Sequence, residues 1–179
     1  IGEIFAYEIS KTLNYSVKEV TTPLGIANCS VPTNKLVLST ILRAGLPLHN
    51  GFLNYFDNAQ NAFVAAYRKY GKDNKFTIQI EYVSSPKLDG KTLVIADPML
   101  ATGSSLVLAY EKLCTLGEPE HTHIVCPIAS KDSLAYLSKH LPHKKVTLWV
   151  AAVDEELTNK SYIVPGIGDA GDLAFGEKL

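Results

Sequence analysis

The chain has 179 residues, of which 20% are charged and 46% are hydrophobic, and its formal net charge is −1. This composition is typical of a soluble globular protein with one sizeable core, and it lacks the basic excess that a nucleic-acid partner usually requires. The longest largely apolar run, residues 146–153, is too short to span a membrane, and the three widely spaced cysteines predict a reduced, cytoplasmic setting rather than a disulfide framework or metal site.

The first third of the chain predicts two helices and a buried strand. Residues 1–13 carry apolar side chains at a helical spacing, whereas residues 15–30 mix turn residues with short extended pieces. Residues 35–42 form an apolar run typical of a buried strand, 43–47 read as a turn, and 48–56 present one apolar helical face. Since the chain opens at Ile1 already in a helical pattern, we expect the natural protein to extend upstream.

The middle of the chain predicts an exposed hairpin and then a central strand. Residues 62–67 read as a short apolar strand, and 76–83 alternate apolar and polar residues, as in a half-exposed antiparallel strand. We therefore expect a β-arm over about residues 72–87. Residues 92–96 predict a buried strand, and residues 106–116 a helix that Gly117 ends.

The C-terminal part continues the alternation of strands and helices. Residues 122–129 and 146–153 predict buried strands, and residues 131–141 a helix between them. This order predicts the α/β class, with a twisted, mostly parallel sheet flanked by helices. Right-handed crossovers then place the strand ends after Leu42, Ala96 and Val153 along one edge of the sheet.

The most informative stretch follows the strand at residues 92–96. It reads Asp97-Pro98-Met99-Leu100-Ala101-Thr102-Gly103-Ser104-Ser105. A turn of small residues that leads into a helix offers backbone N–H groups to an anion, and its hydroxyls add donors. It lacks the Gly-Lys-Ser/Thr ending of a nucleotide P-loop. The residues predict a phosphate site with Asp97 beside it; alternatively, Asp97 only caps the helix.

The tail at residues 162–172 is rich in glycine and contains Pro165. This composition predicts neither a helix nor a regular strand. Such a loop presents backbone N–H and C=O groups at close range, which suits recognition of a flat polar ring; a purely structural Ω-loop is the alternative. We expect a solvated turn at residues 154–156 and solvated histidines at 121, 123, 140 and 143, with the lone Trp149 in the core.

Three motifs together resemble those of type I phosphoribosyltransferases, and more narrowly those of uracil phosphoribosyltransferases. Residues 97–105 are similar to the loop of that family that binds phosphoribosyl pyrophosphate (PRPP), with Ser104 where the family usually has glycine. Thr40-Ile41-Leu42-Arg43-Ala44-Gly45-Leu46 resembles its pyrophosphate loop, and residues 162–172 its uracil-binding loop. The motifs occur in the order of the family and span nearly the whole chain.

The resemblance implies a reaction and a set of roles. Uracil and PRPP would give uridine monophosphate (UMP) and diphosphate, with Asp97 on the ribose hydroxyls and residues 101–105 on the 5′-phosphate. The implied PRPP contacts are Arg43, Arg68, Asp97, Pro98, Met99, Leu100, Ala101, Thr102, Gly103, Ser104, Ser105 and Asp169. The implied uracil contacts are Ile163, Gly168, Asp169 and Ala170. Asp169 and Arg43 would be the catalytic residues.

The resemblance also implies Mg²⁺ as the cofactor, bound mainly through PRPP and water rather than through a protein metal site. It implies a single phosphoribosyltransferase domain over residues 1–179, with a base-binding tail (the hood) over 158–179, and a homodimer or larger homo-oligomer with GTP as a possible effector. Two other hypotheses stay open at this point. One is a regulator of the same fold that senses uridine nucleotides and binds RNA, and the other is a phosphoribosyltransferase for another base.

Overall fold

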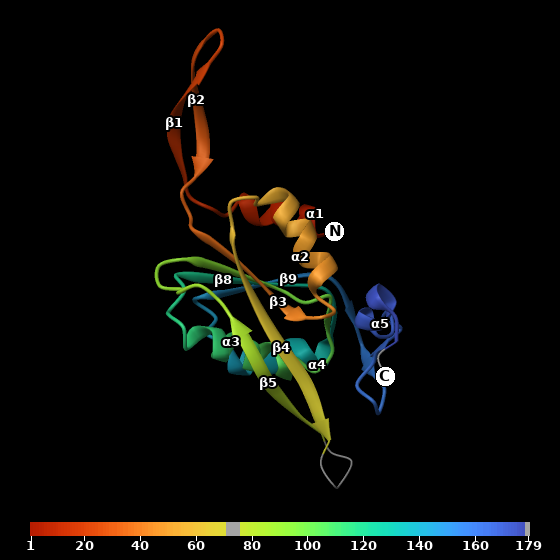
Figure 1. Cartoon of the computed structure of the whole chain (residues 1–179). Coiled ribbons are helices and arrows are strands. Elements are labelled where there is room, and N and C mark those ends of the chain that lie inside the picture. The colour runs from red at the N-terminus through yellow and green to blue at the C-terminus, as the bar shows by residue number, and fades with distance from the viewer. Residues whose placement is uncertain (71–75, 178–179) are drawn as a thin grey trace.

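The structure is a computed structural model that describes residues 1–70 and 76–177, with the backbone alone described at residues 68–70, 76 and 77. The main sheet is mostly parallel, as predicted (Figure 1). Its strand order is β5-β4-β3-β6-β8, with β7 and β9 both paired to β8, and only the β4–β5 pair is antiparallel. The strands are β3 (Leu36–Leu42), β4 (Gln60–Tyr70), β5 (Phe76–Ser84), β6 (Thr92–Ala96), β7 (Met99–Leu100), β8 (His121–Ser130) and β9 (Val146–Asp154).

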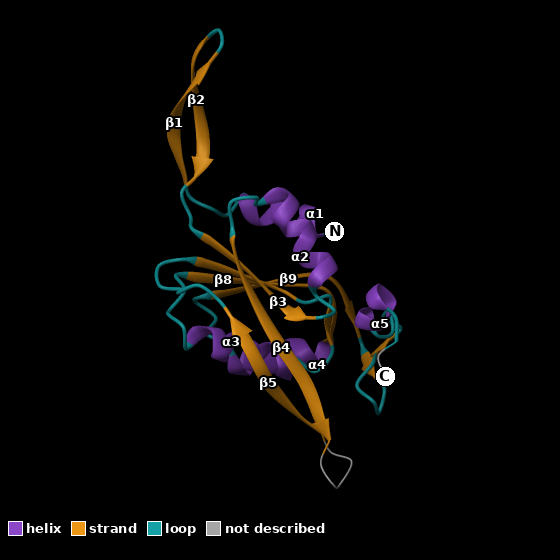
Figure 2. Cartoon of the chain, viewed as in Figure 1, coloured by secondary structure: helices purple, strands orange, loops and turns teal. Residues whose placement is uncertain are grey.

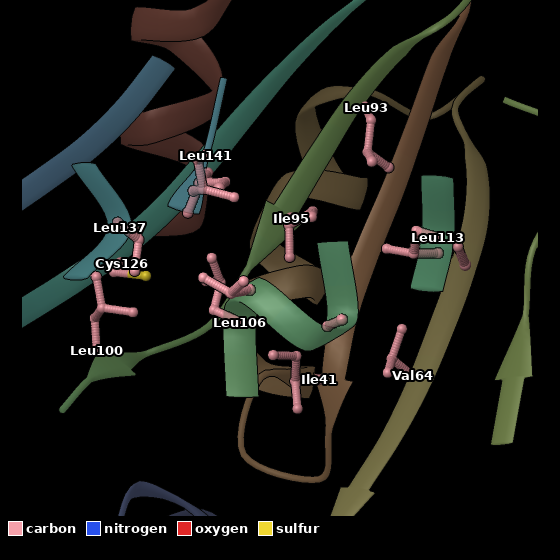
Figure 3. Close-up of a cluster of buried hydrophobic side chains, with 14 of the residues drawn as sticks. Ile41, Val64, Leu93, Ile95, Leu100, Leu106, Leu113, Cys126, Leu137 and Leu141 are labelled. Carbon is pink, nitrogen blue, oxygen red and sulfur yellow. The ribbon is translucent and has the colours of Figure 1, made fainter. Parts of the chain in front are cut away.

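Helices cover both faces of this sheet (Figure 2). They are α1 (Gly2–Ser10) and α2 (Leu46–Tyr55) on one face, and α3 (Ser104–Cys114) and α4 (Lys131–His140) on the other. Because neighbouring residues of a strand point to opposite faces, Leu93 and Ile95 of β6 join the α3–α4 core, whereas Val94 joins the α1–α2 core. Figure 3 shows the first of these cores.

Two helices begin earlier than the sequence predicts. Leu46 and Pro47, predicted as a turn, form the start of α2. Proline is tolerated there because the first N–H groups of a helix have no acceptor within the helix, so its missing N–H loses no helical hydrogen bond. Ser104 likewise opens α3 directly after the turn. In the described ranges, no helix has the length and hydrophobicity that a membrane span needs.

Residues 15–32 form a regular hairpin that the sequence prediction missed. β1 (Tyr15–Thr22) and β2 (Gly25–Pro32) pair antiparallel and project from the body of the molecule as a separate sheet (Figure 1). Nearly all of their side chains are exposed, including that of Cys29. Neither face of the hairpin is buried in its own chain, and its strands lack the continuous apolar runs that mark the strands of the main sheet.

The expected antiparallel strand at residues 76–83 is confirmed as β5, which pairs with β4 with a bulge between Ala65 and Ala66. The tip of the predicted β-arm, at residues 72–75, lies outside the described residues. Together β4 and β5 form a long ribbon that extends past the helices (Figure 1).

The tail contradicts the prediction that it holds neither helix nor strand. Within it, β11 (Ile163–Val164) pairs with β10 (Glu156–Leu157). Of the solvated turn expected at residues 154–156, the exposure of Glu155 and Glu156 is confirmed, but Asp154 ends β9 and Glu156 begins β10. Helix α5 spans Ala170–Phe175. The helix forms despite Gly171 because the Asp169 side chain accepts hydrogen bonds from the backbone N–H groups of Gly171 and Asp172.

One histidine also differs from its prediction. His123 is buried, and its Nδ1 accepts a hydrogen bond from Trp149 Nε1 at 3.1 Å. Burial, with a contribution from His121, lowers the pKa of His123 to about 4. Trp149 packs against the α1–α2 core, as expected, whereas His140 and His143 are exposed.

Candidate functional site

A pocket of about 810 Å³ lies where the carboxyl ends of β3 and β6 meet the C-terminal tail. Open parallel sheets bind ligands at this edge. Three stretches of chain that are far apart in sequence supply most of its described wall. The lining residues are Ile41, Leu42, Arg43, Ala44, Ala66, Tyr67, Ile78, Asp97, Pro98, Met99, Leu100, Ala101, Thr102, Gly103, Ser105, Leu106, Ser161, Tyr162, Asp169, Ala170, Gly171 and Asp172.

The turn between β6 and α3 leaves helical N–H groups available to a ligand. Gly103 is the N-cap of α3 in the left-handed conformation, with φ at 81°, and no side chain caps this helix. The alternative that Asp97 only caps the helix is therefore wrong. The first N–H groups of α3 have no acceptor within the helix, which makes this end of the helix suited to an anion.

Packing fixes the shape of this turn. A Cβ atom at Gly103 would come within 2.5 Å of Leu137 Cδ1, so a larger residue would displace that side chain in addition to straining the backbone. Ser104, which departs from the family motif, is tolerated because it begins the helix and does not have a positive φ. Its Oγ makes a hydrogen bond with Thr102 Oγ1 at 2.8 Å.

Asp97 lies in the pocket wall directly after β6. Desolvation raises the pKa of its carboxyl to about 7, and a hydrogen bond from the backbone N–H of Met99 opposes the shift only in part. The buried thiol of Cys126 lies beside it, and burial together with the Asp97 charge raises the pKa of that thiol. Asp97 is therefore a carboxyl group whose pKa of about 7 lies near neutral pH.

Arg43 follows β3 and is held by the tail. Its Nη2 donates to Asp172 Oδ1 at 2.6 Å and to the backbone oxygen of Gly176 at 2.8 Å. The ring of Phe175 lies 5.9 Å from the guanidinium carbon. Arg43 is the cation among the described lining residues, which also include Asp97, Asp169 and Asp172.

A second contact fixes the tail on its other side. The backbone N–H of Gly166 donates to Asp154 Oδ2, at the end of β9, over 3.1 Å. Ile163 is buried at 3% exposure, which anchors β11. Gly168 is exposed in the left-handed conformation with φ at 77° and has space around its Cα.

The structure brings most of the predicted site residues together around one pocket. Arg43, Asp169, Ala170 and all of residues 97–105 except Ser104 line it. Ile163 and Gly168 lie in the tail outside the described lining. The backbone of Arg68 pairs with Ile78 in the β4–β5 ribbon, but its side chain lies outside the described residues.

Several lining residues were missed by the sequence analysis, notably Tyr67, Ile78, Tyr162 and Asp172. Asp172 and Tyr162 lie inside the tail motif and could have been included on that ground. Tyr67 and Ile78 belong to the β4–β5 ribbon, beyond its bulge, and no motif marks them.

The described residues include no group of three or more histidine, cysteine or acidic side chains that could hold a metal ion by themselves. The pocket does offer carboxylate oxygens from Asp97, Asp169 and Asp172. Oxygen donors suit Mg²⁺, which keeps several waters and usually binds through one or two carboxylates and substrate phosphates.

Comparison with known proteins adds a second line of evidence. The family model for uracil phosphoribosyltransferase matches residues 1–177. The uracil phosphoribosyltransferase of Porphyromonas gingivalis is 58% identical over 179 residues, covering 100% of this chain and 82% of the relative. That of Pyrococcus furiosus is 37% identical over 182 residues, covering 100% of this chain and 77% of the relative.

Solved structures agree on the fold. A protein from Aquifex aeolicus superposes with a TM-score of 0.87 at 34% identity, covering 98% of this chain and 82% of the other. A hypoxanthine phosphoribosyltransferase from Staphylococcus aureus superposes with a TM-score of 0.57 at 14% identity, covering 98% of this chain and 88% of that one, which supports the shared fold alone. The family model and the relatives do not favour the two alternatives, an RNA-binding regulator of the same fold and a phosphoribosyltransferase for another base. The chain belongs to the uracil phosphoribosyltransferase family.

Proposed function

We propose that this pocket transfers the phosphoribosyl group of PRPP to uracil, giving UMP and diphosphate. The observation that carries the proposal is the convergence of three loops on one cavity. They are the turn that opens α3, the Arg43 turn after β3, and the tail around Asp169. A phosphate cradle, a cation for pyrophosphate and a backbone-rich base pocket are the parts that this reaction needs.

Each loop has a role that its chemistry supports. The uncapped start of α3, with Thr102, Ser104 and Ser105, binds the 5′-phosphate through N–H and O–H donors. Asp97 accepts hydrogen bonds from the ribose hydroxyls in its ionised form. Arg43, together with Arg68, neutralises the pyrophosphate group, because a guanidinium is a strong donor to oxyanions.

The tail reads the base. Ile163, Gly168 and Ala170 would present backbone groups to the uracil edges, and Asp169 lies where the base and PRPP meet. The Asp169 side chain is held by the N–H groups of Gly171 and Asp172, so its position is fixed by α5. Tyr162 adds an aromatic side chain to the same wall of the pocket.

The bond changes need no protein nucleophile. The bond between the anomeric carbon and pyrophosphate breaks, and its electron pair leaves with the pyrophosphate oxygen. A uracil nitrogen forms the new bond to that carbon, and its proton passes to water or to the released diphosphate. The anomeric carbon passes through an oxocarbenium-like state, as in glycoside cleavage. Catalysis then rests on alignment of the two substrates and on neutralisation of the leaving charge.

Mg²⁺ is the cofactor that fits this donor set. When bound with PRPP, it would supply positive charge to the pyrophosphate oxygens. The carboxylates of Asp97 and Asp169 are the side chains that could reach the ion or its water ligands. The cytoplasm remains the setting that the free cysteines favour.

We also propose that the protein acts as a homodimer. An isolated two-stranded hairpin is only marginally stable in water, and the β1–β2 hairpin exposes Val17, Leu24 and Ile26. A second copy of the chain is the partner that would cover them. Regulation by GTP stays a prediction.

The experiment is a turnover assay with purified protein, PRPP and Mg²⁺. Uracil should be converted to UMP, whereas hypoxanthine and orotate should not react. Asp169→Ala should reduce turnover strongly, and Leu173→Ala, an exposed position on the same helix, serves as the matched control. No product from uracil would overturn the proposal, and equal rates for all three bases would overturn the role of the tail.

A further inference from the structure

Arg43, the residue assigned to pyrophosphate, is also hydrogen-bonded to the tail. One nitrogen, Nη2, makes both contacts, to Asp172 Oδ1 at 2.6 Å and to the Gly176 backbone oxygen at 2.8 Å. No hydrogen bond joins its Nε or Nη1 atoms to the part of the chain that the structure describes. The guanidinium therefore has N–H groups left for a ligand while it holds the tail.

The tail packs closely around this side chain. A Cβ atom built on Gly171 would lie 3.6 Å from both Arg43 Nε and Ala44 Cβ, so the first turn of α5 rests on the Arg43 loop. Phe175, one turn further along α5, places its ring 5.9 Å from the guanidinium carbon. The N-cap of the same helix is Asp169. Arg43 and the residue proposed to meet the base are thus joined through one short helix.

The ion pair is accessible enough to respond to a ligand. The Arg43 and Asp172 side chains are 36% and 30% exposed, so water and ions reach the pair. Ion pairs at such exposure are weak, and ordering of Arg43 by a ligand can change how firmly the pair holds α5.

We propose that Asp172 is a positioning residue that couples the pyrophosphate and base sites through Arg43. The proposal rests on the proposed function, because it takes Arg43 as the pyrophosphate ligand. Pyrophosphate oxygens bind the N–H groups of Arg43 that the tail leaves unused, which fixes the guanidinium. Asp172 and the Gly176 oxygen then hold α5, and Asp169 with it, in the arrangement that receives uracil. Binding of either ligand therefore orders part of the site, which lowers the entropy cost of binding the other ligand.

The test measures this coupling with ligands that cannot react with each other. Uracil binding is titrated by calorimetry with and without inorganic pyrophosphate and Mg²⁺. In the unmodified protein, pyrophosphate should tighten the dissociation constant of uracil by about fivefold or more, the lower end of common coupling factors. Asp172→Ala should bring the ratio of the uracil dissociation constants without and with pyrophosphate close to one. Asp172→Asn, which keeps an oxygen acceptor but loses the charge, should give an intermediate ratio.

The control is Glu155→Ala, which removes a different exposed ion pair, to Lys131, away from the pocket. In this variant pyrophosphate should tighten uracil binding as much as in the unmodified protein. Thermal unfolding of each variant checks that it is folded. The positioning role would be overturned if pyrophosphate tightened uracil binding equally in folded Asp172→Ala, or if it weakened uracil binding in the unmodified protein. Turnover with uracil would still leave the proposed function intact. A protein that binds no uracil at all would instead overturn the proposed function.

Discussion

Asp154 and Gly166 join the end of β9 to the tail, because the Gly166 backbone N–H donates to Asp154 Oδ2 over 3.1 Å. Asp154 is the last residue of β9, which is fixed by its parallel pairing with β8. Arg43 holds the far end of the same tail through Asp172 and Gly176. The segment that we propose to bind the base therefore lies between these two contacts.

Loss of the Asp154 contact should affect uracil more than PRPP. Asp154→Ala removes the acceptor of a charge-assisted hydrogen bond and should raise the KM for uracil about tenfold, with little change in the KM for PRPP. Asp154→Asn keeps an oxygen at the same place and should recover much of the loss. Steady-state kinetics with each substrate varied in turn measures the split; equal increases in both KM values would contradict a local role in the tail.

The pocket should depend on pH through Asp97. Its folded-state pKa of about 7 predicts that the ionised, ribose-binding fraction rises about tenfold between pH 6 and pH 8, and kcat/KM for PRPP should rise with it. Asp97→Asn should be nearly inactive and should show no such rise. A kinetic profile that is flat in the unmodified protein over this range would count against the assignment.

Stability should change in the opposite sense. Because the folded-state pKa of Asp97 lies above its ordinary value of 3.8, the protonated carboxyl favours the folded state. This contribution is complete below pH 3.8 and is lost as the pH rises through about 7. Urea unfolding should therefore show that Asp97→Asn gains stability relative to the unmodified protein on going from pH 5 to pH 8.

Alanine substitutions at two glycines should distinguish the cost of backbone strain from the cost of a steric clash. Gly90 and Gly103 both have positive φ, but a Cβ on Gly90 meets nothing within 4 Å, whereas one on Gly103 meets Leu137. Gly90→Ala should cost about 1 kcal/mol of unfolding free energy, and Gly103→Ala about 3 kcal/mol, because the second adds overpacking. Gly103→Ala should also raise the KM for PRPP. Urea unfolding and PRPP kinetics measure both effects, and equal losses at the two positions would show that the contact with Leu137 is relieved.

The hairpin should determine the oligomeric state. Ile26→Lys places a charge on the exposed β1–β2 surface and should convert a dimer into monomers at micromolar concentration, as measured by sedimentation velocity. Leu173→Lys changes a side chain of the same exposure, 70%, on α5 and should leave the dimer intact. A monomeric unmodified protein, or dimers of Ile26→Lys, would contradict the proposed role of the hairpin.

The sequence predicted the parallel core well because its signals are local. Residues such as Val94 and Ile95 are buried on opposite faces, so β6 is apolar throughout, and the alternation of such runs with helical faces specifies the class. The turn at residues 97–105 was equally visible, because a positive φ at Gly103 and an uncapped helix start need small residues.

The missed features depend on contacts between distant residues. Helix α5 contains Gly171, which argues against a helix, and besides its local cap Asp169 it is held by Arg43, which lies 129 residues before Asp172 in the chain. The burial of His123 depends on Trp149, which lies 26 residues later in the chain. The β1–β2 hairpin was missed for the opposite reason, since nothing in its own chain buries either of its faces.

The position of Cys29 on β2 makes the hairpin open to selective chemical labelling. Cys29 is exposed, whereas burial raises the pKa of the thiols of Cys114 and Cys126 and so suppresses the reactive thiolate. A maleimide spin label or fluorophore should therefore attach to the natural sequence almost entirely at residue 29. Two such labels would report the distance between hairpins of neighbouring copies, without any engineered cysteine.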